Sequence, residues 1–453
     1  MSNKKILFYP IGIAALFGLL WWLFFFLEPV KALLIIFGIL LIFFIFTKPL
    51  YGLFLLLLVR PTLDIFTHQA VFSWGNFSLN IASLSAVLII SFSFLISLTN
   101  LKKFSAIPLK KSWLLFIFLS FISIFYSLYL SLSLIEWLRI LSIFSLYCLG
   151  FILIKNPAEL KRLILIIVLS ALIPGLVAFF QFFNHTGMTI IDENISNRIF
   201  GTFAHPNLLA YYLIIPLALS VLLILERPKK LFYSSFLKII FIYLFILLLL
   251  TYTRGAWVVF LIIIILFGIV RYRKLLLASL LGMFLLYLLI PPIQTRINNL
   301  FEYDPFSSIT WRINLWKDAL HYSQEKVIGG HGLGTANSVI LDRRGEKLGS
   351  PDPHNDYLKI LLENGLIGLS AYLILISNLL LTLFFGFKKS SENFSKNLYL
   401  LFLGIALALY FMSFADNILR NTALQWAFWV LLGGLFSAYP QPRIDILKSV
   451  FKK

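Results

Sequence analysis

The chain has 453 residues, of which 60% are hydrophobic and 13% are charged, and its formal net charge is +19. Soluble domains are about 45–50% apolar, so this composition excludes an ordinary soluble globular protein. The apolar runs do not alternate with polar residues, as the strands of a membrane barrel would, and they therefore favour membrane-spanning helices.

Apolar runs of about 20 residues, the length that crosses a bilayer as a helix, recur along nearly the whole chain. We predict an all-α, polytopic integral membrane protein that forms a single membrane domain over residues 1–453, with about fourteen transmembrane helices. One turn is expected at Thr253–Arg254, because a single helix through that apolar stretch would be far too long for one crossing. The predicted spans are 6–27, 31–47, 49–59, 79–99, 113–130, 134–154, 163–184, 207–225, 235–253, 255–270, 275–292, 357–385, 396–414 and 420–438.

The distribution of charge predicts the orientation of these spans. With the N-terminus in the cytoplasm, most of the 38 basic residues fall in cytoplasmic segments, together with only a few acidic ones. This arrangement obeys the positive-inside rule and predicts that both termini are cytoplasmic. Membrane topology therefore accounts for the basic charge, and we expect no nucleic-acid partner.

Three polar segments are then expected on the outer face, at about 60–78, 185–206 and 293–356. The last is the largest and is predicted to form the one large extracytoplasmic loop. It contains a helix-like amphipathic pattern in "SITWRINLWKDALHYSQEK" and glycine turns in "VIGGHGLGTANS".

Three basic residues stand at predicted outer ends of spans, where topology does not require them: Arg198, Arg254 and His354. An interfacial arginine commonly reaches to lipid headgroups, and His354 is also compatible with the capped start of a helix. Two converging arginines would instead bind phosphate oxygens, as in a lipid-linked diphosphate. A neutral histidine beside them could remove a proton from an incoming hydroxyl.

Four segments carry a resemblance to a known family. In order, "RIFGTFAHPNLLAYYL", "TYTRGAWVVF", "WRINLWKDAL" followed by "GGHGLGT", and "HNDYLKILLENGLIGL" resemble the O-antigen ligase and polymerase superfamily. The resemblance covers about residues 160–440 and implies a GT-C-like membrane glycosyltransferase. It also implies a bacterial plasma (inner) membrane location with the active site facing the periplasm or exterior.

The resemblance implies roles for particular residues. Arg198 and Arg254 would hold the diphosphate of an undecaprenyl-diphosphate-linked glycan donor, and His354 would activate the acceptor hydroxyl as the catalytic base. Arg312 matches a further recurrent arginine and is a possible substrate-binding residue. The implied reaction is metal-independent, inverts the sugar, and uses no cofactor.

Some residues keep alternative interpretations. His331 lies between the glycines of "GGHGLG", where the family commonly has another residue, and is an alternative base. His205, ahead of Pro206, is interpreted as structural. Asp352 and Asp356 flank His354, but offer few of the convergent oxygens that a hard cation prefers, so no metal site is predicted.

Two acid–base pairs also have alternative interpretations. Glu136 and Arg139 lie three residues apart and share a helix face, which favours a buried structural pair over a lining of the substrate cavity. Asp416 and Arg420, in the short outer turn "FADNILRN", are equally compatible with a structural and a functional role.

The identity of the acceptor stays open at this level. A ligase would glycosylate a lipid acceptor such as lipid A-core, a polymerase would extend another lipid-linked glycan, and an O-oligosaccharyltransferase would modify protein Ser or Thr. The ligase is our first prediction. A polysaccharide transporter or flippase is the rival from another class, and it is disfavoured because transport sites usually lie at the membrane midplane.

Overall fold

The structure is a computed structural model that describes residues 29–67, 70–74, 77–190, 195–226, 231–298, 308–345 and 350–440. The chain divides into two compact units, Met1–Leu56 and Leu57–Lys453. The described part of the first unit is helical. The second unit contains all the predicted site residues.

Helices dominate the fold, and their bounds are as follows. The first nine are α2 (Pro29–Thr47), α3 (Pro49–Val59), α4 (Ile81–Thr99), α5 (Leu101–Ala106), α6 (Lys110–Ile122), α7 (Leu130–Leu153), α8 (Pro157–Leu169), α9 (Leu172–Phe183) and α10 (Pro206–Leu225). The others are α11 (Leu231–Leu250), α12 (Arg254–Val270), α13 (Arg273–Leu289), α14 (Pro291–Asn298), α15 (Ser308–Ser323), α16 (Ala336–Arg344), α17 (Asp356–Lys389), α18 (Asn393–Met412) and α19 (Thr422–Ala438). Short 3-10 turns are η1 (Leu63–Phe66), η2 (Ser123–Tyr126) and η4 (Gln324–Lys326).

The helical fold predicted from the sequence is confirmed. Within the described residues, seven helical segments are long and apolar enough to cross a membrane: α4, α7, α8 with α9, α10, α11, α17 and α18. The pair α13 and α14, bent by 98°, would make an eighth, and α3, α12, α19 and part of α2 are shorter apolar helices. The total of fourteen spans stays a prediction, and the first predicted span, 6–27, lies outside the described residues.

Two predicted spans end earlier than expected. The run 113–130 forms α6 only as far as Ile122 and continues as the 3-10 turn η2. The run 275–292 forms α13 as far as Leu289, after which Pro291 begins α14 at a sharp bend. Proline cannot continue a helix with its normal hydrogen bonds, which explains the second break.

Small strands appear where only polar loops were expected. β1 (Ala70–Trp74) pairs antiparallel with β2 (Phe77–Asn80), and β3 (Met188–Ile190) pairs antiparallel with β4 (Ile195–Arg198). Met188 lies opposite Arg198 in the second hairpin. This hairpin places Arg198 at the end of a strand, beside the N-terminus of α10.

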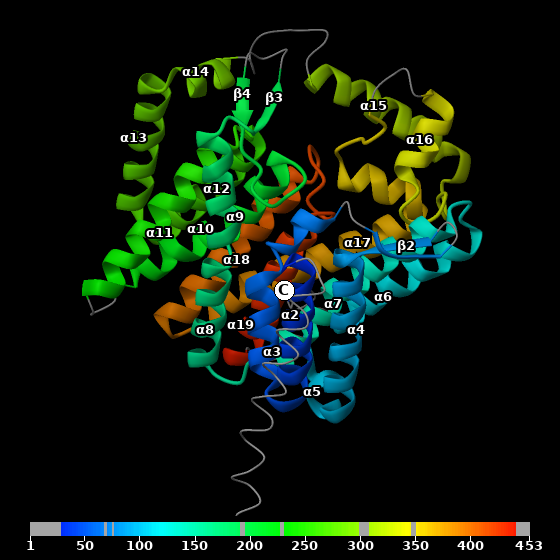
Figure 1. Cartoon of the computed structure of the whole chain (residues 1–453), viewed down its shortest axis with the longest axis horizontal. Helices are drawn as coiled ribbons and strands as arrows, with labels where there is room; N and C mark the ends of the chain where they lie inside the picture. The colour runs from blue at the N-terminus through cyan, green and yellow to red at the C-terminus, as the bar shows by residue number, and fades with distance from the viewer. Residues whose placement is uncertain are drawn as a thin grey trace, which may run out of the picture. The chain divides into compact units, whose positions relative to one another are not determined.

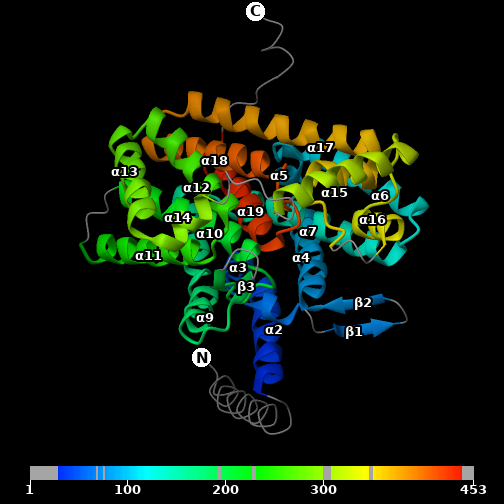
Figure 2. The same ribbon diagram turned by 90° about the horizontal axis from the view of Figure 1, so that it is seen from above.

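Close helix packing builds the core around the site. α7 and α19 approach so closely that a Cβ added at Gly150 would lie 2.2 Å from the carbonyl oxygen of Val430. Such close approach through small residues is a typical way for membrane helices to associate. α17 and α18 lie side by side (Figure 2), and α10 and α19 are buried over most of their length.

The predicted large loop contains helices rather than irregular chain. We call residues 308–345, with α15, η4 and α16, the cap; Figure 1 shows it beside α17. Its apolar core is shared with α17 and consists of Leu315, Ala319, Ala336, Val339, Ile340 and Leu362. The amphipathic pattern at 308–326 thus forms α15 and η4, as predicted, whereas the location of the cap outside the membrane stays a prediction.

The glycine turn of the cap is anchored in a break of α17. Gly365 has a φ of 63°, and this non-helical residue frees carbonyl groups in the turn before it. The amides of His331 and Gly332 donate to the carbonyls of Leu362 and Glu363 at 2.9 and 2.8 Å. The two glycine-containing motifs of the sequence therefore hydrogen-bond to each other.

We expect Gly365→Ala to weaken this anchor. A Cβ at this position would lie 2.2 Å from the Ile328 carbonyl oxygen. Gly365 has a ψ of −166°, which places it in a backbone region that essentially only glycine adopts. Another residue there costs about 1–3 kcal/mol, so the free energy of unfolding should fall by at least about 1 kcal/mol. Thermal unfolding in detergent measures the effect. Gly282→Ala in α13 is the control, because its Cβ would meet nothing within 4 Å; equal midpoints for the two variants would contradict the anchor.

Candidate functional site

His354 immediately precedes α17 and is held in an uncommon backbone conformation. Asn355 is the N-cap of the helix, and its side-chain oxygen accepts a hydrogen bond from the amide of Leu358 at 3.1 Å. His354 itself has a φ of 46°, and its amide donates to Asp352 Oδ1 at 3.0 Å. Non-glycine residues with positive φ concentrate at functional positions, where surrounding contacts maintain them.

The imidazole of His354 faces a buried carboxylate. Its Nδ1 lies 3.3 Å from Asp416 Oδ1, and 26% of its side chain is exposed. Burial alone would raise the pKa of Asp416, but the hydrogen bond and charge of His354, together with the charge of Arg312, hold that pKa below its usual value. Asp416 therefore stays ionised and favours the tautomer with a proton on Nδ1, which leaves Nε2 as the basic nitrogen.

Arg198 is almost fully buried beside this pair. Its Nε donates to the Thr251 carbonyl at 2.8 Å, and its Nη2 lies 3.1 Å from both Asn207 Oδ1 and Thr253 Oγ1. Burial, and then the positive charge of Arg254, lower the pKa of Arg198 to about 10. The guanidinium is nevertheless charged at neutral pH, and it lies close enough to Arg254 for their charges to repel.

Asn207 connects the arginine to the carboxylate. Its Oδ1 accepts from Arg198, while its Nδ2 donates to Asp416 Oδ2 at 2.9 Å. The chain of contacts thus runs from Arg198 through Asn207 and Asp416 to His354. Residues from β4, the start of α10, the loop before α19 and the start of α17 meet here, although they are far apart in the sequence.

Arg254 is the first residue of α12, directly after the turn predicted at Thr253–Arg254. A second arginine, Arg296, lies beside it and was not predicted from the sequence. Arg254 Nη1 lies 3.5 Å from the carbonyl oxygen of Arg296 in α14. Arg296 is buried, and its Nε donates to the carbonyl of Tyr252 at 3.1 Å. The bend between α13 and α14 brings Arg296 back to this turn. Only its position just after a predicted span could have marked it.

Arg312 reaches the same region from the cap. Its Nη1 donates to the carbonyl of Ala415 at 2.7 Å, next to Asp416. Trp311, its neighbour in α15, stands with its ring 6.0 Å from the His354 ring, edge to face. The site thus contains four guanidinium groups, those of Arg198, Arg254, Arg296 and Arg312. Among the described residues, the carboxylate of Asp416 contacts both His354 and Asn207. An excess of fixed positive charge suits a phosphate-bearing ligand.

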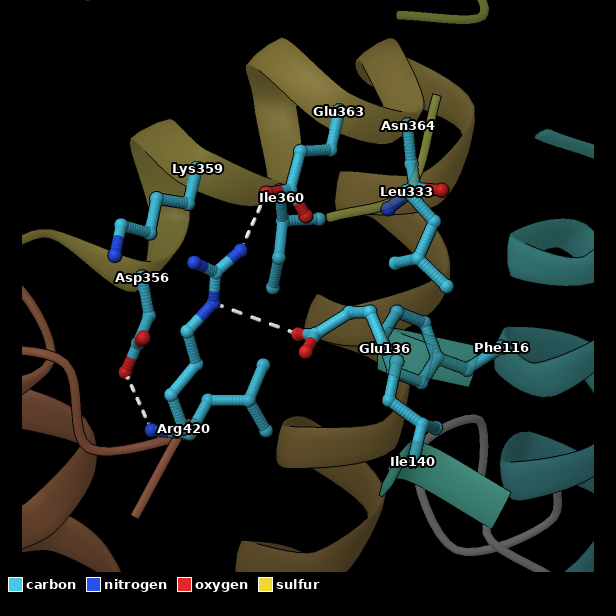
Figure 3. Close-up of a pocket in the computed structure, with 11 residues that line it drawn as sticks. Phe116, Glu136, Ile140, Leu333, Asp356, Lys359, Ile360, Glu363, Asn364 and Arg420 are labelled. Carbon is cyan, nitrogen blue, oxygen red and sulfur yellow. Dashed lines mark hydrogen bonds and ion pairs between the residues drawn. The ribbon is translucent and has the colours of Figure 1, made fainter. Parts of the chain in front are cut away.

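A second group of charges lies buried behind the site and links α7, α17 and the loop before α19. Arg420 Nη2 is 2.5 Å from Glu363 Oε1, and Arg420 Nε is 3.4 Å from Glu136 Oε1 (Figure 3). Glu136 also pairs with Arg139 at 2.5 Å, and Arg139 donates to the carbonyl of Leu419. The space left among these side chains is about 10 Å³, which is room for one water molecule at most.

This arrangement gives different roles to the two acid–base pairs that the sequence suggested. Glu136 and Arg139 belong to the buried group, which agrees with their interpretation as a structural pair. Arg420 joins them, whereas Asp416, four residues earlier, belongs to the site. The sequence could not separate Asp416 from Arg420, because both lie in the same short turn.

The other two histidines have protein partners elsewhere. His331 is buried in the cap, and its Nε2 lies 3.1 Å from the Tyr322 carbonyl oxygen. His205 is the N-cap of α10, and its Nδ1 accepts from the amide of Asn207 at 3.1 Å. Neither ring is hydrogen-bonded to the Asp416 and His354 pair in the described structure.

The two aspartates beside His354 are also engaged. Asp352 forms an ion pair with Lys359, and Asp356 Oδ2 accepts from the amide of Leu419 at 2.8 Å. Among the described residues, no three His, Cys, Asp or Glu side chains gather as they would around a metal ion.

Residues 239–373 match a protein-family model described as O-antigen ligase. The match supports membership of the O-antigen ligase family, and it covers less than half of the chain. The matched residues include Arg254, Arg296, Arg312 and His354, whereas Arg198 and Asp416 lie outside them. No curated protein matches the chain. Together with the apolar helices, the match supports an integral membrane protein that is an O-antigen ligase-like glycosyltransferase.

We expect His205, the N-cap residue of α10, to make the stability of the protein depend on pH. Burial, and then the charge of Arg198, lower the pKa of His205 to about 4. Because the unfolded histidine titrates near 6.5, the unfolded chain binds more protons between pH 6.5 and 4, and stability should fall as pH decreases through this window.

We expect His205→Asn to retain the cap and to reduce this dependence, whereas His205→Leu should lose about 1 kcal/mol of stability at pH 7. Thermal midpoints measured at pH 7, 6 and 5 test both expectations. An unchanged pH dependence in His205→Asn would show that another group is responsible.

Proposed function

We propose that the protein transfers a glycan from an undecaprenyl-diphosphate-linked donor to an acceptor hydroxyl at the outer face of the bacterial plasma membrane, as an O-antigen ligase. The observation that carries this proposal is the pairing of His354 with Asp416 next to four arginines. A base and a fixed polycationic surface are the two elements that such a transfer needs.

In the proposed donor complex, Arg198 and Arg254 bind the diphosphate. Both side chains are already held by backbone and side-chain oxygens, so little conformational freedom is lost when the donor binds. Arg312 and Arg296 add positive charge around the same position. Charge-assisted hydrogen bonds from guanidinium to phosphate stabilise the leaving diphosphate, so this proposal requires neither a metal nor a general acid.

In the proposed chemical step, His354 Nε2 removes the proton of the acceptor hydroxyl. The hydroxyl oxygen forms a bond to the anomeric carbon as the bond from that carbon to the diphosphate oxygen breaks. The electron pair leaves with the diphosphate, and the proton remains on His354, where Asp416 stabilises the imidazolium. A single displacement inverts the configuration of the sugar.

The site lies on the outer side in the predicted topology, because His354 and Arg254 occupy outer ends of predicted spans. Both termini would then be cytoplasmic. Membrane lipids surround the helices, and the lipid part of the donor would lie in the outer leaflet while its diphosphate reaches the arginines.

We expect His354→Gln and Arg254→Gln to impair different steps of the reaction. Loss of the base should lower kcat about 10²–10⁴-fold with little change in the KM for donor. Loss of one charged phosphate contact should raise the KM for donor about 10–100-fold. Purified protein in nanodiscs, lipid-linked donor and a lipid acceptor form the assay, with a chelator present throughout.

His321→Gln, an exposed histidine of α15, is the matched control for the first variant, and Arg343→Gln in α16 is the control for the second. Full transfer activity in His354→Gln would refute its assignment as the base. Loss of activity with chelator in the wild type would refute the metal-independent reaction.

Deletion of the gene in its host should identify the acceptor. For a ligase, complete polymer should accumulate on the carrier lipid, because only the final transfer is blocked. Accumulation of single repeats would indicate a polymerase instead, and loss of glycan from proteins would indicate an O-oligosaccharyltransferase. Glycan profiling of the lipid fraction, with the wild-type gene restored as control, distinguishes these outcomes.

A further inference from the structure

The segment that carries the base is held by Asp352, which makes three separate contacts. Its Oδ1 accepts the amide of His354 at 3.0 Å, and its Oδ2 accepts from Asn417 Nδ2 at 2.9 Å. Asn417 follows Asp416, and its own amide donates to Asp416 Oδ1 at 2.8 Å. Asp352 therefore connects the backbone of His354 to the loop that carries its carboxylate partner.

The third contact of Asp352 is with Lys359, one turn into α17. Lys359 Nζ lies 2.6 Å from Asp352 Oδ1, in a geometry that makes the contact an ion pair rather than a directed hydrogen bond. Lys359 is only 2% exposed. Burial would raise the pKa of Asp352, but the charge of Lys359 outweighs this effect and holds that pKa below its usual value.

The direction of the lysine side chain matters for its role. Lys359 borders the same small cavity as Glu136, Glu363 and Arg420, but Figure 3 shows its ammonium pointing away from the contact between Arg420 and Glu136. Those two glutamates are already neutralised by arginines. Lys359 instead forms an ion pair with Asp352, in the segment before α17.

A buried lysine is costly in stability, and an apolar residue of similar volume commonly serves as well or better in a core. A charge at this position therefore needs a reason beyond packing. Asp352 supplies one, because a carboxylate held at a fixed position keeps His354 in its left-handed conformation, with Nδ1 toward Asp416. Loss of that position would turn Nε2 away from the acceptor.

We propose that Lys359 is a positioning residue of the transfer reaction, acting through Asp352 to hold His354 in its orientation toward Asp416. It touches no substrate itself. This inference rests on the proposed function, in which His354 is the base. A residue that merely stabilised the start of α17 would not act through Asp352, so a variant that also changes Asp352 distinguishes the two roles.

Three variants test this route: Lys359→Met, Asp352→Asn and the double variant. Lys359→Met leaves the half-buried carboxylate of Asp352 without its cation. In the double variant the amide of residue 352 is neutral and can still accept from the His354 amide. Asn417 can turn its side chain to accept from the new amide, since its Oδ1 has no hydrogen-bond partner among the described residues.

We expect Lys359→Met to lower kcat about 10–100-fold, because a small displacement of a catalytic group has effects of that size. The KM for donor should change by less than about twofold, since the arginines that hold the diphosphate are untouched. The double variant should be more active than Lys359→Met alone. Lys317→Met, an exposed lysine of α15, makes the same side-chain change and should leave both parameters unaltered.

A second readout does not depend on transferase activity. Diethyl pyrocarbonate acylates the accessible, neutral nitrogen of a histidine ring, and peptide mass spectrometry resolves each site. In folded Lys359→Met the rate at His354 should differ at least about twofold from the wild type, because the ring loses its fixed orientation, and the double variant should return toward the wild-type rate. The rate at His321 should stay constant in all variants.

The outcomes separate the two proposals. A double variant that is less active than either single variant, with the acylation rate of His354 unchanged throughout, would overturn the positioning role. If the wild type transfers no glycan while Lys359→Met still alters acylation of His354 and the double variant reverses it, the proposed function fails and the positioning of His354 stands.

Discussion

The ion pair between Arg420 and Glu363 is the contact on which the rest of the site depends. It joins the loop before α19 to α17 inside the protein, and Glu136 extends it to α7. Removing one residue of this pair would leave the other charge unpaired inside the protein, which strongly lowers stability. These contacts hold the loop, which also carries Ala415, Asp416 and Asn417, against α17 and α7.

The same loop positions residues of a site in which positive side chains outnumber negative ones. Asp416 contacts His354 and accepts a hydrogen bond from Asn207. The carbonyl of Ala415 accepts a hydrogen bond from Arg312. The four arginines of the site outnumber its carboxylates, Asp416 and Asp352. Repulsion among the arginines is tolerated because each is tied to oxygens of the chain, and an anionic ligand would relieve it. In the proposed function, this arrangement would bind a diphosphate with little rearrangement of the arginines.

Much of this could be anticipated from particular residues. His354, Arg198 and Arg254 stood out because topology does not explain basic residues at outer helix ends, and the structure brings them into one region with Arg312. Arg296 was missed because it follows two prolines in a segment without a marked pattern. The contact of Asp416 with His354 was missed because the two residues are 62 positions apart and come together only through helix packing.

The sequence by itself determined the helical membrane character, the approximate helix positions and the motif residues, because these depend on local hydropathy, charge and turn residues. Only the tertiary structure decided which charges face one another. It assigned Asp416 to His354 and Arg420 to the buried glutamates, although both lie in one short turn. These partners depend on the directions in which side chains point from packed helices and on the need to pair buried charges. Neither can be read from a local sequence pattern.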